Sequence, residues 1–130
     1  MLVVDDERLM RWSLTETLAD CGDIVTQAEN GDTAVRALRG DTAPDVVLLD
    51  YVLPDSRDLS LLATLKRLAP STHIILMTAC CTPELAAEAL AQGAHRVISK
   101  PFDMDDVAAL VHRAARYTLP DERPDHSCRR

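Results

Sequence analysis

Short apolar runs alternate with amphipathic stretches along most of the chain. Five runs have the length of β-strands, and they occupy residues 1–4, 24–28, 46–49, 74–77 and 97–98. The third and fourth are continuously apolar, which is typical of strands covered on both faces of a sheet. The second run is the least apolar of the five.

Between these runs, apolar residues recur at helical spacing, and residues typical of helix ends flank them. Gly22, Gly40, Pro70 and Gly93 follow four of the stretches. Thr82 before Pro83 predicts an N-cap, and Asp103 opens the last helix. Five strand–helix units in succession predict an α/β fold, with a parallel sheet and helices on both of its faces.

Length and composition place this pattern in one globular domain. The 130 residues suffice for a single domain, and the apolar fraction of 47% supports a packed core. The predicted domain covers residues 1–117. The stretch 118–130 has two prolines and no apolar periodicity, so we interpret it as a tail or a truncated linker.

Charge and residue usage narrow the function. Fourteen Lys and Arg against 21 Asp and Glu give a net charge of −7, and aromatic residues make up 3%. Both features argue against binding of nucleic acid by this domain. We find no apolar run that could span a bilayer and no secretory signal, so we expect a cytoplasmic protein without membrane contact. The four cysteines then read as reduced thiols, and the four histidines are scattered, with none assigned as a ligand.

Polar residues follow the ends of four of the five predicted strands. Asp5 and Asp6 follow the first, Asp50 ends the third, Thr78 ends the fourth, and Lys100 comes after the fifth. The carboxyl ends of parallel strands meet at the edge of the sheet where ligands bind. We therefore expect these five side chains to form one site.

The chemistry of that edge points to phosphoryl transfer. Two carboxylates about 5 Å apart repel by roughly 3 kcal/mol at an effective dielectric near 20. A hard cation such as Mg²⁺ removes this repulsion, Lys100 can hold a phosphoryl group, and an aspartate is a candidate nucleophile. Taken singly, each residue has a simpler role: Asp5 and Asp6 could cap the first helix, Asp50 could be a loop acid, and Thr78 could be a turn residue.

These residues also resemble a known family. Val3 to Glu7, Val47 to Asp50 with Leu53-Pro54 after it, Met77 to Ala79, and Lys100 to Phe102 resemble the motifs of bacterial response regulator receiver domains. Asp5 to Glu7 followed by Arg11 to Leu14 is similar to receivers of the nitrogen-regulation type, which precede an ATPase and a DNA-binding module.

The resemblance implies a flavodoxin-like, doubly wound sheet with strand order 2-1-3-4-5 and five helices. It implies that Asp50 accepts a phosphoryl group from a histidine kinase or a phosphotransfer protein. Asp6, Asp50 and the backbone carbonyl of Val52 would ligate Mg²⁺, and Asp5 would act mainly through water. Lys100 and Thr78 would bind the phosphoryl oxygens, and the Lys100–Pro101 bond would be cis.

It further implies a signalling switch rather than a turnover enzyme, limited to self-phosphorylation and slow self-dephosphorylation. The output would be transcription, and the face of the fourth helix, fifth strand and fifth helix would support a homodimer.

The sequence departs from the family pattern at three places. Val97 stands where receivers usually have an aromatic residue, Arg57-Asp58 replaces the usual Asp-Gly, and the first strand begins at Met1. Two alternatives remain. An aspartyl-phosphate hydrolase of the haloacid-dehalogenase type needs a second acid two residues after the nucleophile, where this chain has Val52. A degenerate receiver that only binds partners would not need all five site residues.

Overall fold

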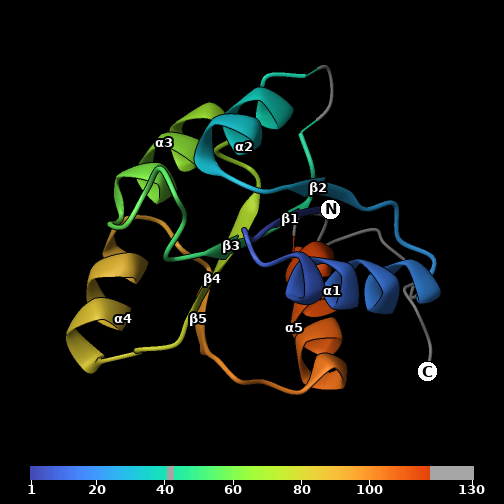
Figure 1. Ribbon diagram of the computed structural model, residues 1–130. Helices are drawn as coiled ribbons and strands as arrows, with labels where there is room; N and C mark the ends of the chain where they lie inside the picture. The colour runs from blue at the N-terminus through green and yellow to red at the C-terminus, as the bar shows by residue number, and fades with distance from the viewer. Residues whose placement is uncertain (41–42, 118–130) are drawn as a thin grey trace.

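The computed structural model describes residues 1–40 and 43–117. In this part of the chain, five strands and five helices alternate, as the apolar pattern predicted (Figure 1). The strands are β1 (Leu2–Val4), β2 (Thr26–Ala28), β3 (Val46–Asp50), β4 (His73–Thr78) and β5 (Arg96–Ser99). The helices are α1 (Arg8–Asp20), α2 (Gly31–Leu38), α3 (Ser60–Leu68), α4 (Pro83–Ala91) and α5 (Met104–Tyr117). The predicted tail at 118–130 lies outside the described residues.

All strand pairs are parallel, and the sheet order is β2-β1-β3-β4-β5. The order confirms the doubly wound, flavodoxin-like arrangement. The chain leaves β1 to form β2 on one side and returns to β3 on the other, so β1 and β3 are neighbours at the point where the order reverses. In such sheets this reversal opens a crevice beyond the carboxyl ends of the strands.

Two layers of helices enclose the sheet (Figure 1). Helices α1 and α5 cover one face, where Leu14, Leu18 and Val111 pack on buried residues of β1, β3 and β4. Helices α2, α3 and α4 cover the other face, where Leu62 and Leu65 lie in a second buried cluster. Because β3 is covered on both faces, all five of its residues are buried, which explains its uninterrupted apolar run.

Several helix ends follow the predicted chemistry. The Thr82 hydroxyl accepts a hydrogen bond from the Leu85 N–H, with Pro83 in the first turn of α4. Gly22 and Gly93 have positive φ angles of 92° and 111°, in the region that favours glycine just after a helix. At Gly93 an added Cβ would also lie 2.8 Å from Cγ of Lys66.

The sequence pattern overstates burial at the sheet edge and on α1. Strand β2 begins at Thr26 rather than at residue 24, and Ile24 is 87% exposed. Leu9, counted among the periodic apolar residues of the first helix, is 68% exposed. An edge strand and the first turn of a helix have few neighbours, so apolar residues there stay in water. Among the described helices, none is long and apolar enough to cross a membrane.

Candidate functional site

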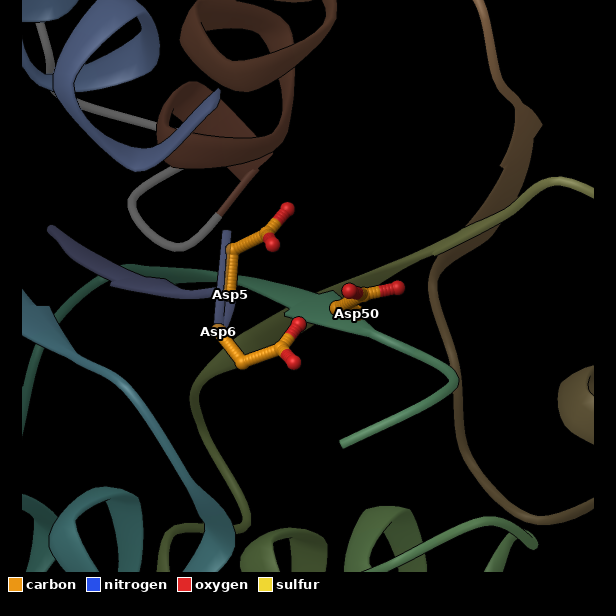
Figure 2. A group of neighbouring side chains, drawn as sticks. All are labelled: Asp5, Asp6 and Asp50. Atoms are coloured by element: carbon orange, nitrogen blue, oxygen red, sulfur yellow. The ribbon is translucent and has the colours of Figure 1, made fainter. Parts of the chain in front are cut away.

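The carboxyl ends of β1 and β3 bring three acids together, as Figure 2 shows for Asp5, Asp6 and Asp50. The pairing of Val4 with Leu49 places the residue after β1 beside the last residue of β3. One carboxylate oxygen from each acid lies within 4.8 Å of the other two. Asp5 is fully buried, Asp50 is 8% exposed and Asp6 is exposed. The arrangement is the one predicted from the strand ends.

Lys100 enters this cluster from the segment after β5. Its Nζ lies 3.1 Å from Oδ2 of Asp5 and 3.3 Å from Oδ2 of Asp50, and only 17% of the side chain is exposed. The Lys100 N–H donates to the Thr78 carbonyl at 2.8 Å, which fixes the start of this segment against β4. The Lys100–Pro101 peptide bond is cis, as the resemblance implied.

The electrostatics of the cluster follow from burial and from like charge. Burial and the neighbouring charge of Asp5 raise the pKa of Asp50 to about 6, against the opposing influence of Lys100. Burial by itself would lower the pKa of Lys100, but the charges of Asp5 and Asp50 together outweigh it and raise that pKa. The site therefore holds three carboxylates and one ammonium, which contacts Asp5 and Asp50, and when ionised it carries an excess of negative charge in a region partly closed to water.

Thr78 and Val52 complete the edge. The Thr78 side chain is buried, and its hydroxyl accepts a hydrogen bond from the Cys80 N–H at 3.1 Å. The Val52 N–H points at Oδ1 of Asp50 from 3.5 Å, and the Val52 side chain is exposed. All the residues predicted for the site thus lie at one edge, at the last positions of β3 and β4 and in the segments that follow β1, β3 and β5.

Neither Asp5 nor Asp6 is the N-cap of α1. Glu7 is the N-cap of that helix, and it makes no side-chain capping hydrogen bond. Oδ1 of Asp5 accepts instead from the Glu7 N–H at 2.9 Å, in a turn that precedes the helix. This bond and the contact with Lys100 occupy both oxygens of Asp5.

At two of the three departures from the family pattern, the structure shows what the different side chains do. Val97 is partly buried and packs against the apolar cluster under α2, α3 and α4. Among the described residues, only glycines have a positive φ, so Asp58 does not adopt the conformation that a glycine there would permit. The Asp58 carboxylate accepts instead from the N–H and hydroxyl of Ser60, at the start of α3.

Sequence reasoning missed Asp55, which ties the loop after β3 to α2. Its carboxylate accepts from the N–H groups of Gly31 and Asp32, at 2.8 Å and 3.0 Å. The Gly31 hydrogen bond is the main reason why the pKa of Asp55 is lowered. A Cβ on Gly31 would lie 3.1 Å from this carboxylate. No local pattern could reveal the contact, because its partners come from a segment before β3.

Comparison with known proteins assigns the family. The sequence model of the response regulator receiver domain matches residues 1–112. The chain is 39% identical over 122 residues to the DNA-binding transcriptional regulator NtrC of Escherichia coli, and this match covers 94% of the chain but 26% of that protein. It is 32% identical to the chemotaxis protein CheY of Listeria monocytogenes, covering 89% of the chain and 98% of CheY.

A solved structure agrees with these matches. The receiver domain of NtrX from Brucella abortus is 34% identical and superposes with a TM-score of 0.80, over 88% of this chain and 97% of that one. The fold, the order of the strands and the sequence motifs all lead to the same assignment: the chain belongs to the response regulator receiver domain family of two-component signalling, and is related to NtrC and CheY.

Proposed function

We propose that Asp50 is a phosphoryl acceptor and that its modification switches the domain between two conformations. The observation that carries the proposal is the convergence of Asp5, Asp6 and Asp50 within 4.8 Å, with Lys100 placed between two of them. Such a group is costly to bury unless a ligand balances its charge.

The donor set fits Mg²⁺. The three carboxylates and one ammonium sum to two negative charges when all are ionised, which a divalent cation neutralises. Hard carboxylate and carbonyl oxygens are the protein ligands that Mg²⁺ prefers, together with water and phosphate oxygens. Asp6, Asp50 and the Val52 carbonyl would hold the ion, and Asp5 would act through water. When bound, the ion would neutralise developing charge on the phosphoryl oxygens.

The transfer itself needs positioning more than covalent catalysis. An Asp50 oxygen attacks the phosphorus of a kinase's phosphohistidine. The P–O bond forms, the P–N bond breaks, and the ring nitrogen leaves with the electron pair and gains a proton. With a pKa of about 6, Asp50 is mostly ionised at pH 7.5 and available for attack. Lys100 Nζ, already 3.3 Å from Asp50, pairs with a phosphoryl oxygen.

Thr78 provides the conformational step. Its hydroxyl now accepts from the Cys80 N–H, so the oxygen is tied to the loop between β4 and α4. Turning to donate to a phosphoryl oxygen would break or stretch that bond and move the loop. The phosphorylated state then differs from the free state in a contact that the ligand alone provides, as a two-state switch requires.

In this proposal the domain works in the cytoplasm as a switch and not as a turnover enzyme. Self-phosphorylation and slow self-dephosphorylation are its only reactions. A hydrolase of the haloacid-dehalogenase type would need an acid where Val52 stands. The phosphoryl donor is a histidine kinase or a phosphotransfer protein. Because the NtrC relatives are named transcriptional regulators and are about four times as long, the output we propose is transcription, carried by other domains.

The same proposal includes a homodimer through the face of α4, β5 and α5. Two side chains on this face are open to water. Leu90 on α4 is half exposed, and Arg96 on β5, the next element in the chain, is exposed. Sedimentation velocity with and without beryllofluoride tests this part: Leu90→Ser should weaken a dimer that forms on activation, and a monomer under both conditions would reject it.

Intact-mass measurement after incubation with acetyl phosphate and Mg²⁺ tests the acceptor. The unmodified protein should gain one phosphoryl group, and Asp50→Asn should gain none. Asp58→Asn is the matched control, because Asp58 is an exposed acid in the loop that follows Asp50 and should be dispensable for labelling. Equal labelling of Asp50→Asn and of the unmodified protein would reject the assignment.

A further inference from the structure

Two histidines lie close together at the amino-terminal ends of the strands, the end of the sheet opposite the acidic cluster. His73 is the first residue of β4, and His95 immediately precedes β5, its neighbour in the sheet. The centroids of the two rings are 4.7 Å apart, with an angle of 62° between the planes. Both side chains are partly buried. The sequence alone gave no reason to pair them.

The backbone holds this pair in place. The His73 N–H donates to the Asp45 carbonyl at 2.9 Å, and the His95 N–H donates to the Ile74 carbonyl at 2.7 Å. The parallel pairing of β4 and β5, visible in Figure 1, continues directly from these residues. These hydrogen bonds fix the backbone of both residues, so a ligand that bridges the rings would not have to order the backbone first.

The separation matches that of two imidazoles on one metal ion. With metal–nitrogen bonds of about 2.0–2.1 Å in a tetrahedral site, two coordinated rings have centroids about 5 Å apart. We propose that His73 and His95 together bind one borderline transition-metal dication, of which Zn²⁺ is the representative, through one nitrogen of each ring. Water would fill the remaining positions.

The surrounding charges permit this binding and limit its strength. Burial is the main reason why the pKa of each histidine is lowered, and Lys66 and the neighbouring cationic residues add to the effect. Neutral imidazole is the form that binds metals, so no proton has to be displaced at neutral pH. Asp45 opposes the cations at His73, and the Lys66 ammonium is held by the Thr72 carbonyl at 2.9 Å.

The two edges of the sheet would then select different ions. Nitrogen ligands favour Zn²⁺, Ni²⁺ and Cu²⁺ over Mg²⁺, whereas the oxygen ligands at Asp5, Asp6 and Asp50 favour Mg²⁺. The histidine site is independent of the proposed phosphorylation. It would bridge β4 and β5 and bind the folded state, so that Zn²⁺ should raise the melting temperature even when Mg²⁺ is already present.

Calorimetric titration of the 130-residue chain with ZnCl₂, at pH 7.5 in millimolar Mg²⁺ and a phosphine reductant, tests the site. We expect a site of one ion per chain whose affinity falls at least tenfold in His73→Gln and in His95→Gln. His112→Gln is the matched control, because His112 lies on α5 with Nε2 2.7 Å from Asp23 and should leave the affinity unchanged. Replacing Cys80 and Cys81 by serine should also leave it unchanged.

Unchanged affinity in both glutamine variants would overturn the proposal, and so would a loss seen only in the serine or His112 variants. If the variants fold poorly, the ring ¹⁵N–¹H spectrum of the unmodified protein replaces them. Addition of ZnCl₂ should shift the ring signals of His73 and His95 together at the same equivalence point. Signals that stay in place at saturating Zn²⁺ would reject the site.

Discussion

The carboxyl ends and the amino ends of the strands, here called the carboxyl edge and the amino edge, differ in whether their charged side chains are buried. At the carboxyl edge, Asp5 and Asp50 are buried beside each other, with Lys100 as the cation between them. At the amino edge, Asp45 is exposed, and Lys66 is satisfied by a backbone carbonyl. The sheet provides an equally regular frame at both ends. Among the residues that the structure describes at these two ends, like charges lie together out of water at the carboxyl edge, so a cation or a phosphoryl group has most to stabilise there.

Removing the lysine ammonium at each edge should give the largest difference in the free energy of unfolding. Without metal at pH 7.5, Lys100→Met leaves two buried carboxylates uncompensated, and we expect a loss of about 3 kcal/mol in the free energy of unfolding. Lys66→Met removes one hydrogen bond to a carbonyl and should cost about 1 kcal/mol. Urea unfolding of both variants measures the difference. Equal losses would show that the carboxyl edge is not special.

Magnesium should act on one edge only. A ligand at 100 times its Kd stabilises the native state by about 2.7 kcal/mol, which raises the melting temperature by several degrees for a domain of this size. Thermal unfolding with and without millimolar Mg²⁺ should show this shift in the unmodified protein and in Asp45→Asn, and much less of it in Asp6→Asn. A full shift in Asp6→Asn would remove that residue from the metal site.

The smallest expected effect is the response of the β5 backbone around Val97 to activation. Val97 packs as a partly buried aliphatic residue on β5, and a β-branched side chain is stiff about χ1. We therefore expect beryllofluoride to shift backbone amide signals mainly in residues 78–92, with little change at 95–98. Two-dimensional ¹⁵N–¹H spectra measure this directly. Shifts of equal size across β5 would show that the switch does not depend on an aromatic ring there.

The sequence predicts the parts of this molecule that depend on local pattern and on topology. The apolar run before Asp50 predicts a covered strand, and the strand-end rule places Asp5, Asp50, Thr78 and Lys100 at one edge. The same pattern misplaces the start of β2, because Ile24 is apolar but has no neighbours to cover it.

Other features depend on register and side-chain direction, which a single sequence does not contain. No feature of the neighbouring sequence distinguishes Asp5 from Asp6. Asp5 is buried and accepts a hydrogen bond from Lys100, whereas Asp6 is exposed. The bond from Gly31 to Asp55 and the contact of His73 with His95 each join segments that are distant in the chain. They become visible only when the helices and strands are placed in space.

In the function we propose, the ionised form of Asp50 destabilises the folded protein as long as no metal is bound. Its pKa of about 6 in the folded protein exceeds the ordinary aspartate pKa of 3.8. The native state therefore binds an additional proton at Asp50 between these values, and the contribution of Asp50 to stability falls as the pH rises from about 4 through 6. The cost at pH 7.5 is at most about 3 kcal/mol.

The most direct test compares metal-free unfolding free energies of the unmodified protein and Asp50→Asn between pH 4.5 and 7.5. Asparagine has nearly the same shape and no charge, and the remaining acids titrate in both proteins. We predict that Asp50→Asn is the more stable protein at pH 7.5, by about 1–3 kcal/mol, and that its advantage shrinks as the pH is lowered to 4.5. A variant that is less stable at pH 7.5, or a difference independent of pH, would contradict the account.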